Sequence, residues 1–220
     1  MSAAAVSDAS PLKDMSLLNE YEHLNWPGGD LVMGIDEAGR GPLCGPLVVA
    51  CCVLPSGYSN DLIDDSKKLT EKKREELFKV IIKDAVYFAF KIVKPKEIDE
   101  LNIYAATRKA MAELAKSYDV KQVLTDAMKI EEDPKVIPII KGDAKSISIA
   151  AASILAKVLR DHIMWGYDHL HPEYEYIRHK GYPTRRHLEL MEKYGIFDIY
   201  RMSYRPCQNK KFRNFQNTCQ

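Results

Sequence analysis

The sequence predicts an α/β protein, with a mixed β-sheet flanked by helices and a small helical C-terminal region. Apolar runs rich in β-branched and aromatic residues alternate with segments of helical periodicity. The first two apolar runs, 31–35 and 46–54, are separated only by a glycine-rich link, which indicates neighbouring strands. A stretch rich in Ala, Ile and Leu, 144–167, has the length and composition of a largely buried helix.

The elements follow in order along the chain. Residues 1–14 supply little to bury and are expected to be disordered, and 15–24 has the spacing of a short helix. Thr70 is a good N-cap for a later helix. The expected strands are 31–35, 46–54, 86–93, 120–125 and 135–140, and the expected helices are 71–83, a short one after Pro95, 103–117 and 144–167. We therefore expect a catalytic domain over 15–167 and a helical region with a basic tail over 168–220.

Composition limits the class of protein. At 220 residues and 46% hydrophobic, the chain can bury one good core, and a net charge of +1 neither favours nor excludes nucleic acid. The five cysteines form no C-x-x-C pair, which argues for reduced thiols in a cytoplasmic protein. The N-terminus lacks a signal peptide, and no apolar run is long enough to cross a membrane. The basic segment 210–213 is expected to be disordered rather than an arm for nucleic acid.

Four carboxylates follow expected strand ends or precede the long helix, namely Asp36, Glu37, Asp126 and Asp143. The carboxyl ends of parallel strands meet at one sheet edge, where α/β proteins bind ligands. Four such charges repel each other unless cations lie among them, and oxygen ligands select Mg²⁺ or Mn²⁺ over Zn²⁺. Asp161 is expected to lie outside the cluster, roughly 27 Å along the helix from Asp143.

Each carboxylate also has a simpler interpretation. Asp36 and Glu37 could end their strand in solvent, Asp126 could be a turn residue, and Asp143 could be the N-cap of the long helix. Arg40 lies among glycines that suit contact with a ligand better than a buried salt bridge. A dinucleotide fingerprint is a poor interpretation of these glycines, because their spacing is not G-x-G-x-x-G and prolines interrupt the segment.

The string Asp36-Glu37-Ala38-Gly39-Arg40-Gly41-Pro42-Leu43 resembles the signature of the type 2 ribonucleases H (ribonuclease HII), in the form of the single-chain bacterial enzymes. Three further strings resemble that family in the same order, namely 64–69, 141–161 and 179–184 with His187 after it. One departure is Ala127, where the family usually has glycine. The resemblance covers roughly 34–194 and implies a ribonuclease H-like fold.

The resemblance also implies an activity and a set of roles. It implies cleavage of RNA within RNA/DNA hybrids and nicking 5′ of single ribonucleotides in duplex DNA. Residue by residue, it places the four carboxylates at the metal-binding positions, Gly39, Arg40 and Gly41 on the loop that reads the ribose 2′-OH, and Tyr182 on the aromatic that checks the next deoxyribose. From the residues alone, Tyr182 would be a hydrophobic plug between helices.

Phosphate contacts are expected from the lysines Lys67, Lys68, Lys145 and Lys180, and from Arg185 and Arg186, although each could be a solvated surface charge. His162, His169 and His171 match no metal-ligand set and are expected to be surface or packing residues. We expect a monomer whose partners are RNA/DNA hybrids and ribonucleotide-containing duplex DNA. The alternatives are a metal-dependent DNA nuclease or strand transferase indifferent to the 2′-OH, and a non-catalytic nucleic-acid binding module.

Overall fold

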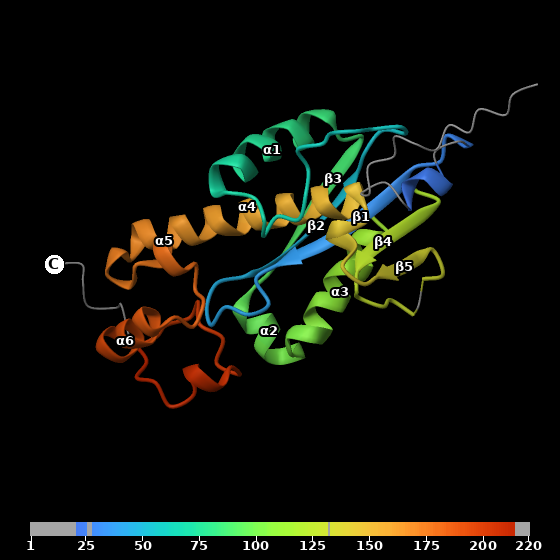
Figure 1. The fold of residues 1–220 in the computed structure, drawn as a ribbon. Coiled ribbons are helices and arrows are strands. Elements are labelled where there is room, and N and C mark those ends of the chain that lie inside the picture. The colour runs from blue at the N-terminus through green and yellow to red at the C-terminus, as the bar shows by residue number, and fades with distance from the viewer. Residues whose placement is uncertain (1–20, 26–27, 132, 214–220) are drawn as a thin grey trace, which may run out of the picture.

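A five-stranded mixed sheet forms the centre of the fold in the computed structural model, which describes residues 21–25, 28–131 and 133–213 (Figure 1). The strands are β1 (Val32–Ala38), β2 (Leu47–Val53), β3 (Tyr87–Val93), β4 (Gln122–Asp126) and β5 (Val136–Ile139). They lie in the order β3-β2-β1-β4-β5. The β3-β2-β1 pairs are antiparallel, and β1-β4 and β4-β5 are parallel. The prediction of a mixed sheet is therefore confirmed.

The first two apolar runs are neighbouring strands, as predicted, but β1 is longer than expected. Its register with β2 continues past Ile35, pairing Asp36 with Ala50 and Ala38 with Val48. The two adjacent carboxylates therefore lie within the strand and not after it. Consecutive side chains of a strand point to opposite faces, so Asp36 and Glu37 have different surroundings.

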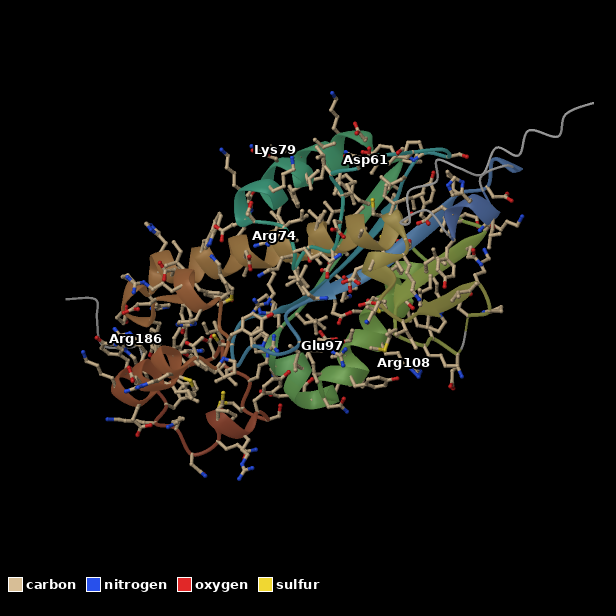
Figure 2. All side chains as sticks on the ribbon, viewed as in Figure 1. Asp61, Arg74, Lys79, Glu97, Arg108 and Arg186 are labelled. Atoms are coloured by element: carbon tan, nitrogen blue, oxygen red, sulfur yellow. The ribbon has the colours of Figure 1, made fainter. Side chains whose placement is uncertain are left out.

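Helices cover both faces of the sheet (Figure 1). The helices of the fold are α1 (Glu71–Asp84), α2 (Pro95–Leu101), α3 (Ile103–Ala115), α4 (Ile147–Leu170), α5 (Tyr176–His179) and α6 (Arg185–Tyr194), of which α5 and α6 lie beyond the sheet in the C-terminal region. The apolar face of α3 packs on one side of the sheet through Ala106, Ala110 and Met111. The other side is covered by α4 with α1 outside it. Charged side chains such as Lys79 point outward from α1 (Figure 2).

The long helix begins three residues later than predicted. The N-cap of α4 is Ser146, whose Oγ accepts a hydrogen bond from the Ile149 amide at 3.1 Å. Asp143 lies before this cap in a 3-10 turn, Gly142–Ala144, so its simpler interpretation as the helix cap is wrong. The α4 backbone touches β1 at Gly34, where an added Cβ would lie 2.1 Å from the carbonyl carbon of Ser148. Only glycine permits this approach of strand and helix.

The C-terminal region forms a third apolar cluster, which joins the α4 residue Met164 to α6 and to Leu43 and Cys44 of the link between β1 and β2. Since α4 continues to Leu170, its last turn crosses the expected boundary at 167/168. The segment 210–213, expected to be disordered, is ordered: the Arg213 amide donates to the Ile196 carbonyl at 2.7 Å. It packs there as part of the C-terminal region.

The expected disordered extension 1–14 and most of the expected helix 15–24 lie outside the described residues. The end of that helix is a 3-10 turn, Glu22–Leu24. Within the described ranges, no helix combines the length and apolar character needed to span a bilayer.

Candidate active site

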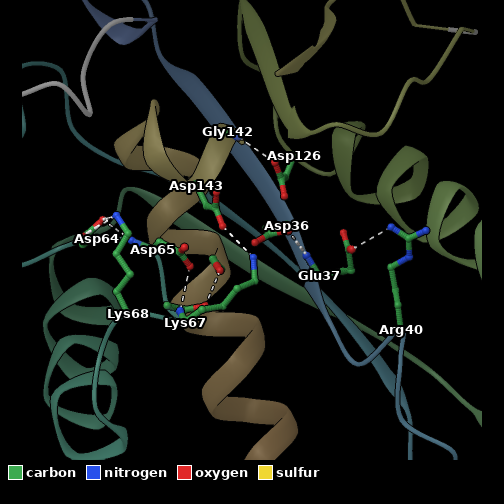
Figure 3. A network of polar contacts seen from close by, with 12 residues as sticks. Asp36, Glu37, Arg40, Asp64, Asp65, Lys67, Lys68, Asp126, Gly142 and Asp143 are labelled. Carbon is green, nitrogen blue, oxygen red and sulfur yellow. Dashed lines mark hydrogen bonds and ion pairs between the residues drawn. The ribbon is translucent and has the colours of Figure 1, made fainter. Parts of the chain in front are cut away.

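Three of the four predicted carboxylates meet at the edge of the sheet where β1, β4 and β5 end (Figure 3). Asp36, Asp126 and Asp143 each place an oxygen within 4.8 Å of the others. Asp36 comes from β1, Asp126 from the end of β4, and Asp143 from the turn after β5. Parallel pairing of these strands brings their ends together, which is the convergence the sequence predicted.

Burial and mutual repulsion disfavour the charged forms of the carboxylates in this cluster. Asp36 is 3% exposed. Burial, and then the charges of Glu37 and Asp126, raise its pKa well above the ordinary value. Burial likewise raises the pKa of Asp126, although its Oδ1 accepts a hydrogen bond from the Gly142 amide at 2.8 Å. The ammonium of Lys67 contacts Asp143 Oδ2 at 3.0 Å and neutralises part of the charge. A hard divalent cation bound to these oxygens would relieve the remaining repulsion.

Glu37 lies beside this cluster and not in it. Its Oε1 is 3.5 Å from Arg40 Nη1, and because the Arg40 side chain is 46% exposed this ion pair is not the buried salt bridge that the sequence disfavoured. Its other carboxylate oxygen, Oε2, is buried and has no hydrogen-bond partner among the described residues. Burial raises the pKa of Glu37. An unpartnered buried carboxylate oxygen beside three other carboxylates has the chemistry of a further cation ligand.

A cleft of about 220 Å³ opens over the carboxylates, and most of the predicted site residues line it. Its lining includes Gly39, Arg40, Gly41, Lys67 and Tyr182. The Tyr182 ring faces Gly41, where its Cε1 would lie 3.5 Å from an added Cβ. Because Tyr182 is 42% exposed, it is not the buried plug that its residue type alone would suggest.

Two buried arginines hold the loop between β1 and β2, and the sequence analysis missed both. Arg160 of α4 donates to the carbonyls of Pro46, Lys180 and Cys44 at 3.0–3.2 Å. Arg201 donates to the carbonyls of Gly39, Arg40 and Gly45 at 2.6–3.2 Å. Gly39, at a φ of 103°, leaves room for Arg160, since an added Cβ would lie 2.2 Å from its Nε. Arg160 lies inside a family-like string, whereas Arg201 carried no signal in the sequence.

Other residues of the cleft also escaped the sequence analysis. Ser66, Ser153 and Lys157 line it, and the hydroxyls of Ser66 and Ser153 are 2.8 Å apart. The loop that carries Ser66 and Lys67 is held by Arg74 of α1, which donates to the Ser66 carbonyl at 3.0 Å (Figure 2). Serine and lysine are common on surfaces, so their residue types gave no signal, although all three lie inside the strings 64–69 and 141–161 that resemble the family.

The other predicted phosphate-binding side chains are dispersed. Lys68 pairs with Asp64 at the surface, and Arg185 and Arg186 pair with glutamates on or near α6. Lys180 is only 9% exposed, and its ammonium lies 4.7 Å from the centre of the Trp165 ring. Lys145 is half-buried beyond the turn that carries Asp143. Of the predicted cations, Arg40 and Lys67 line the cleft.

The remaining sequence interpretations have direct structural counterparts. Asp161 pairs with Lys157 at 2.7 Å and is not part of the carboxylate cluster. His162 contacts Glu75 at 2.7 Å, as a surface residue would. Ala127, where the family usually has glycine, adopts a φ of 53°, in the left-handed region that favours glycine. The alanine therefore retains the glycine-like backbone at a cost of about 1–2 kcal/mol.

The fold and the site together define a class of protein: α/β enzymes that use carboxylate-bound divalent metal ions. Comparison with known proteins identifies the family. A sequence profile of ribonuclease HII matches residues 33–207. Ribonuclease HII of Caldanaerobacter subterraneus subsp. tengcongensis is 50% identical over 199 residues, covering 88% of this chain and 82% of the relative. Ribonuclease HII of Francisella tularensis subsp. novicida is 49% identical over 181 residues, covering 81% and 98%.

Solved structures agree with the sequence relatives. The crystal structure of ribonuclease H2 from Pyrococcus horikoshii OT3 superposes with a TM-score of 0.69 at 30% identity, covering 80% of this chain and 95% of that one. The chain belongs to the ribonuclease HII family. The members of this family are metal-dependent hydrolases that act on RNA in RNA/DNA hybrids.

Proposed function

We propose that this protein is an endonuclease that cuts the RNA strand of RNA/DNA hybrids and nicks duplex DNA 5′ of a single ribonucleotide. The products carry 5′-phosphate and 3′-hydroxyl ends. The observation that supports this most directly is the shared cleft, in which the carboxylate cluster faces the Gly39–Gly41 loop and Tyr182. This shared cleft supports a proposal in which the carboxylates carry the chemistry and the loop with Tyr182 recognises the sugars.

The carboxylates suit divalent metal ions. Asp36, Asp126 and Asp143, with the unpartnered oxygen of Glu37 beside them, would hold two Mg²⁺ or Mn²⁺ ions. When bound, such ions activate a water molecule and stabilise the leaving oxygen of a phosphodiester. Lys67, which neutralises Asp143, is positioned to contact a substrate phosphate once cations take over that role.

Selectivity for ribose belongs to the other wall of the cleft. The carbonyls of Gly39 and Arg40 already accept hydrogen bonds from Arg201, which fixes the loop. With no Cβ at Gly39 or Gly41, the loop backbone can approach a 2′-OH closely. The Tyr182 ring would then pack on the sugar of the next nucleotide. This contact favours a deoxyribose, because a ribose would place against the ring a 2′-hydroxyl that the ring cannot bind. Lys68, Lys145 and Lys180 are proposed to act along the flanking phosphates.

The test uses an end-labelled DNA duplex with one ribonucleotide, an all-DNA duplex of the same sequence, and an RNA/DNA hybrid. We expect a single nick 5′ of the ribonucleotide in Mg²⁺ or Mn²⁺, cleavage of the hybrid, an intact DNA control, and no cleavage in EDTA. Cleavage of the all-DNA duplex would instead indicate a general nuclease. Metal-independent binding to all three duplexes without product would indicate a binding module. Size-exclusion chromatography tests the expected monomer.

A further inference from the structure

Two buried histidines form a stacked pair directly behind Tyr182. His179 ends α5 and His187 lies in the first turn of α6, and their ring centres are 4.1 Å apart with 15° between the planes. Their exposed fractions are 6% and 0%. Neither side chain lines the cleft, so neither is explained by metal binding or by contact with substrate.

The partners of His187 determine which of its ring nitrogens carries the proton. Its Nδ1 lies 2.9 Å from the carbonyl oxygen of Tyr182, which can only accept, so Nδ1–H is the donor. Its Nε2 then accepts from the hydroxyl of Tyr200, also at 2.9 Å. The Tyr200 hydroxyl in turn accepts from the Tyr176 hydroxyl at 3.0 Å. The ring is thereby held by one bond to the Tyr182 main chain and one to a buried tyrosine pair.

His179 is held in the opposite tautomer. Its Nε2–H donates to the Tyr174 carbonyl at 2.8 Å, so its Nδ1 is free to accept from the Gly181 amide at 3.1 Å. Each ring therefore needs one proton only. Burial lowers the pKa of both histidines, that of His187 to about 4, so both rings are neutral at neutral pH.

Together the two rings fix both ends of one short turn. Lys180 and Gly181 have φ values of 49° and 85°, so the chain reverses sharply before Tyr182. His179 binds the amide of Gly181, and His187 binds the carbonyl of Tyr182. The Gly181 carbonyl accepts from the Leu43 amide at 2.8 Å, which docks the turn on the loop between β1 and β2. The turn therefore sets where the Tyr182 ring stands relative to Gly41.

We infer that His179 and His187 are positioning residues that hold Tyr182 against Gly41 and thereby set selectivity for the sugar on the 3′ side of the recognised ribonucleotide. This inference rests on the proposed function, because it assigns Tyr182 to that sugar. A duplex with one ribonucleotide has deoxyribose at this position, whereas a hybrid has ribose. Displacement of Tyr182 should therefore lower incision at single ribonucleotides more than cleavage of hybrids.

Amide side chains offer a matched pair of substitutions. Asparagine places its amide near the Nδ1 position of histidine, and glutamine places its amide near Nε2. His187→Asn keeps a donor to the Tyr182 carbonyl and loses the Tyr200 contact, whereas His187→Gln does the reverse. Both remove the same ring from the same buried site, so they carry similar losses of packing. Tyr200→Phe removes the hydroxyl that contacts His187 and accepts from Tyr176, and leaves the His187 ring in place.

The readout is the kcat/KM for the single-ribonucleotide duplex divided by that for the hybrid. We expect His187→Asn and Tyr200→Phe to keep this ratio within about twofold of wild type. We expect His187→Gln and Tyr182→Ala each to lower it at least about tenfold, because displacements of about 1 Å can cost about 100-fold in rate. Calorimetric titration with Mn²⁺ should show equal metal binding in all variants, since none touches a carboxylate.

The positioning role would be overturned if His187→Asn and His187→Gln gave equal kcat/KM ratios, provided that urea unfolding shows both variants to be folded and both bind Mn²⁺. If His187→Gln does not fold, the same comparison at His179 decides, because His179→Asn keeps an acceptor for the Gly181 amide and His179→Gln does not. A wild-type enzyme that cuts the all-DNA duplex equally well would refute the proposed function itself. The two failures are thus distinguishable in one set of assays.

Discussion

Replacement of Asp126 by Asn should make the protein more stable than the wild type in EDTA and less stable than the wild type when a divalent metal is added. The substitution keeps the Oδ1 acceptor for the Gly142 amide and removes one charge from the cluster. With oxygens within 4.8 Å, each pair of full charges repels by at least about 3 kcal/mol at an effective dielectric constant of about 20. Asn removes two of the three pairs among these carboxylates. Partial protonation, Lys67 and salt reduce the net gain, which we expect to be about 1–2 kcal/mol in EDTA.

Metal should reverse this order. A cation present at about 100 times its Kd stabilises the wild type by about 2.7 kcal/mol. For a chain of this size, that raises Tm by about 5–11 °C, whereas Asp126→Asn in EDTA should melt about 2–8 °C above the wild type. The variant, having lost a ligand, should gain little from Mg²⁺ or Mn²⁺ and should have no measurable turnover.

Thermal melts in EDTA and across a Mg²⁺ titration measure both effects. Asp119→Asn is the matched control, because Asp119 is a fully solvated carboxylate that pairs with Lys135 at 3.4 Å, and it should change neither Tm nor the metal response. A wild type more stable than Asp126→Asn in EDTA, or equal gains of the two proteins in Mg²⁺, would refute the electrostatic reasoning. Full nuclease activity of Asp126→Asn would refute the assignment of metal ligands.

Two further substitutions test the packing that supports the site. Gly34→Ala should lower the free energy of unfolding by about 1–3 kcal/mol and activity by about 100-fold, because its Cβ would push the strand away from Ser148. Urea unfolding and nicking assays measure these two effects. A wild-type nicking rate in this variant would contradict the backbone contact. Glu22 is fully buried and accepts from Ser146 Oγ and the Ser148 amide, and burial raises its pKa above 4.5. A raised carboxyl pKa contributes stability below about pH 4.5 that is lost as pH rises through the raised value. The stability of wild type relative to Glu22→Gln should therefore fall as pH rises above about 4.5, and a difference that stays constant with pH would show that folding does not raise the pKa of Glu22.

Much of the fold follows from local pattern. Thr70 accepts from the Lys73 amide as the predicted N-cap of α1, and the strand and helix positions agree because apolar periodicity is a local property. The meeting of Asp36, Asp126 and Asp143 was also predictable, since strand direction alone brings those ends together. The exact ends of the elements were not predictable from the sequence, because pairing with β2 extends β1 through Asp36 and Glu37.

The residues that sequence reasoning missed are polar groups whose burial depends on distant partners. Arginine and lysine are ordinarily surface residues, so nothing local marks Arg160 or Arg201 as buried, or places Lys180 over Trp165. The ion pair of Glu37 with Arg40 depends on the shape of a loop that α4 and the C-terminal region fix through Arg160 and Arg201. Such features depend on tertiary contacts between distant segments.

The contact of Arg201 with Gly39, 162 positions earlier, has a consequence for synthesis of the protein. Translation proceeds from the N-terminus, and all the clustered carboxylates have been made once Asp143 leaves the ribosome. The guanidinium that fixes the Gly39–Gly41 loop emerges later, after α6 has been made. A nascent chain can therefore contain all its clustered carboxylates before it can shape the loop proposed to read the sugar, and that loop is complete only once Arg201 has been added.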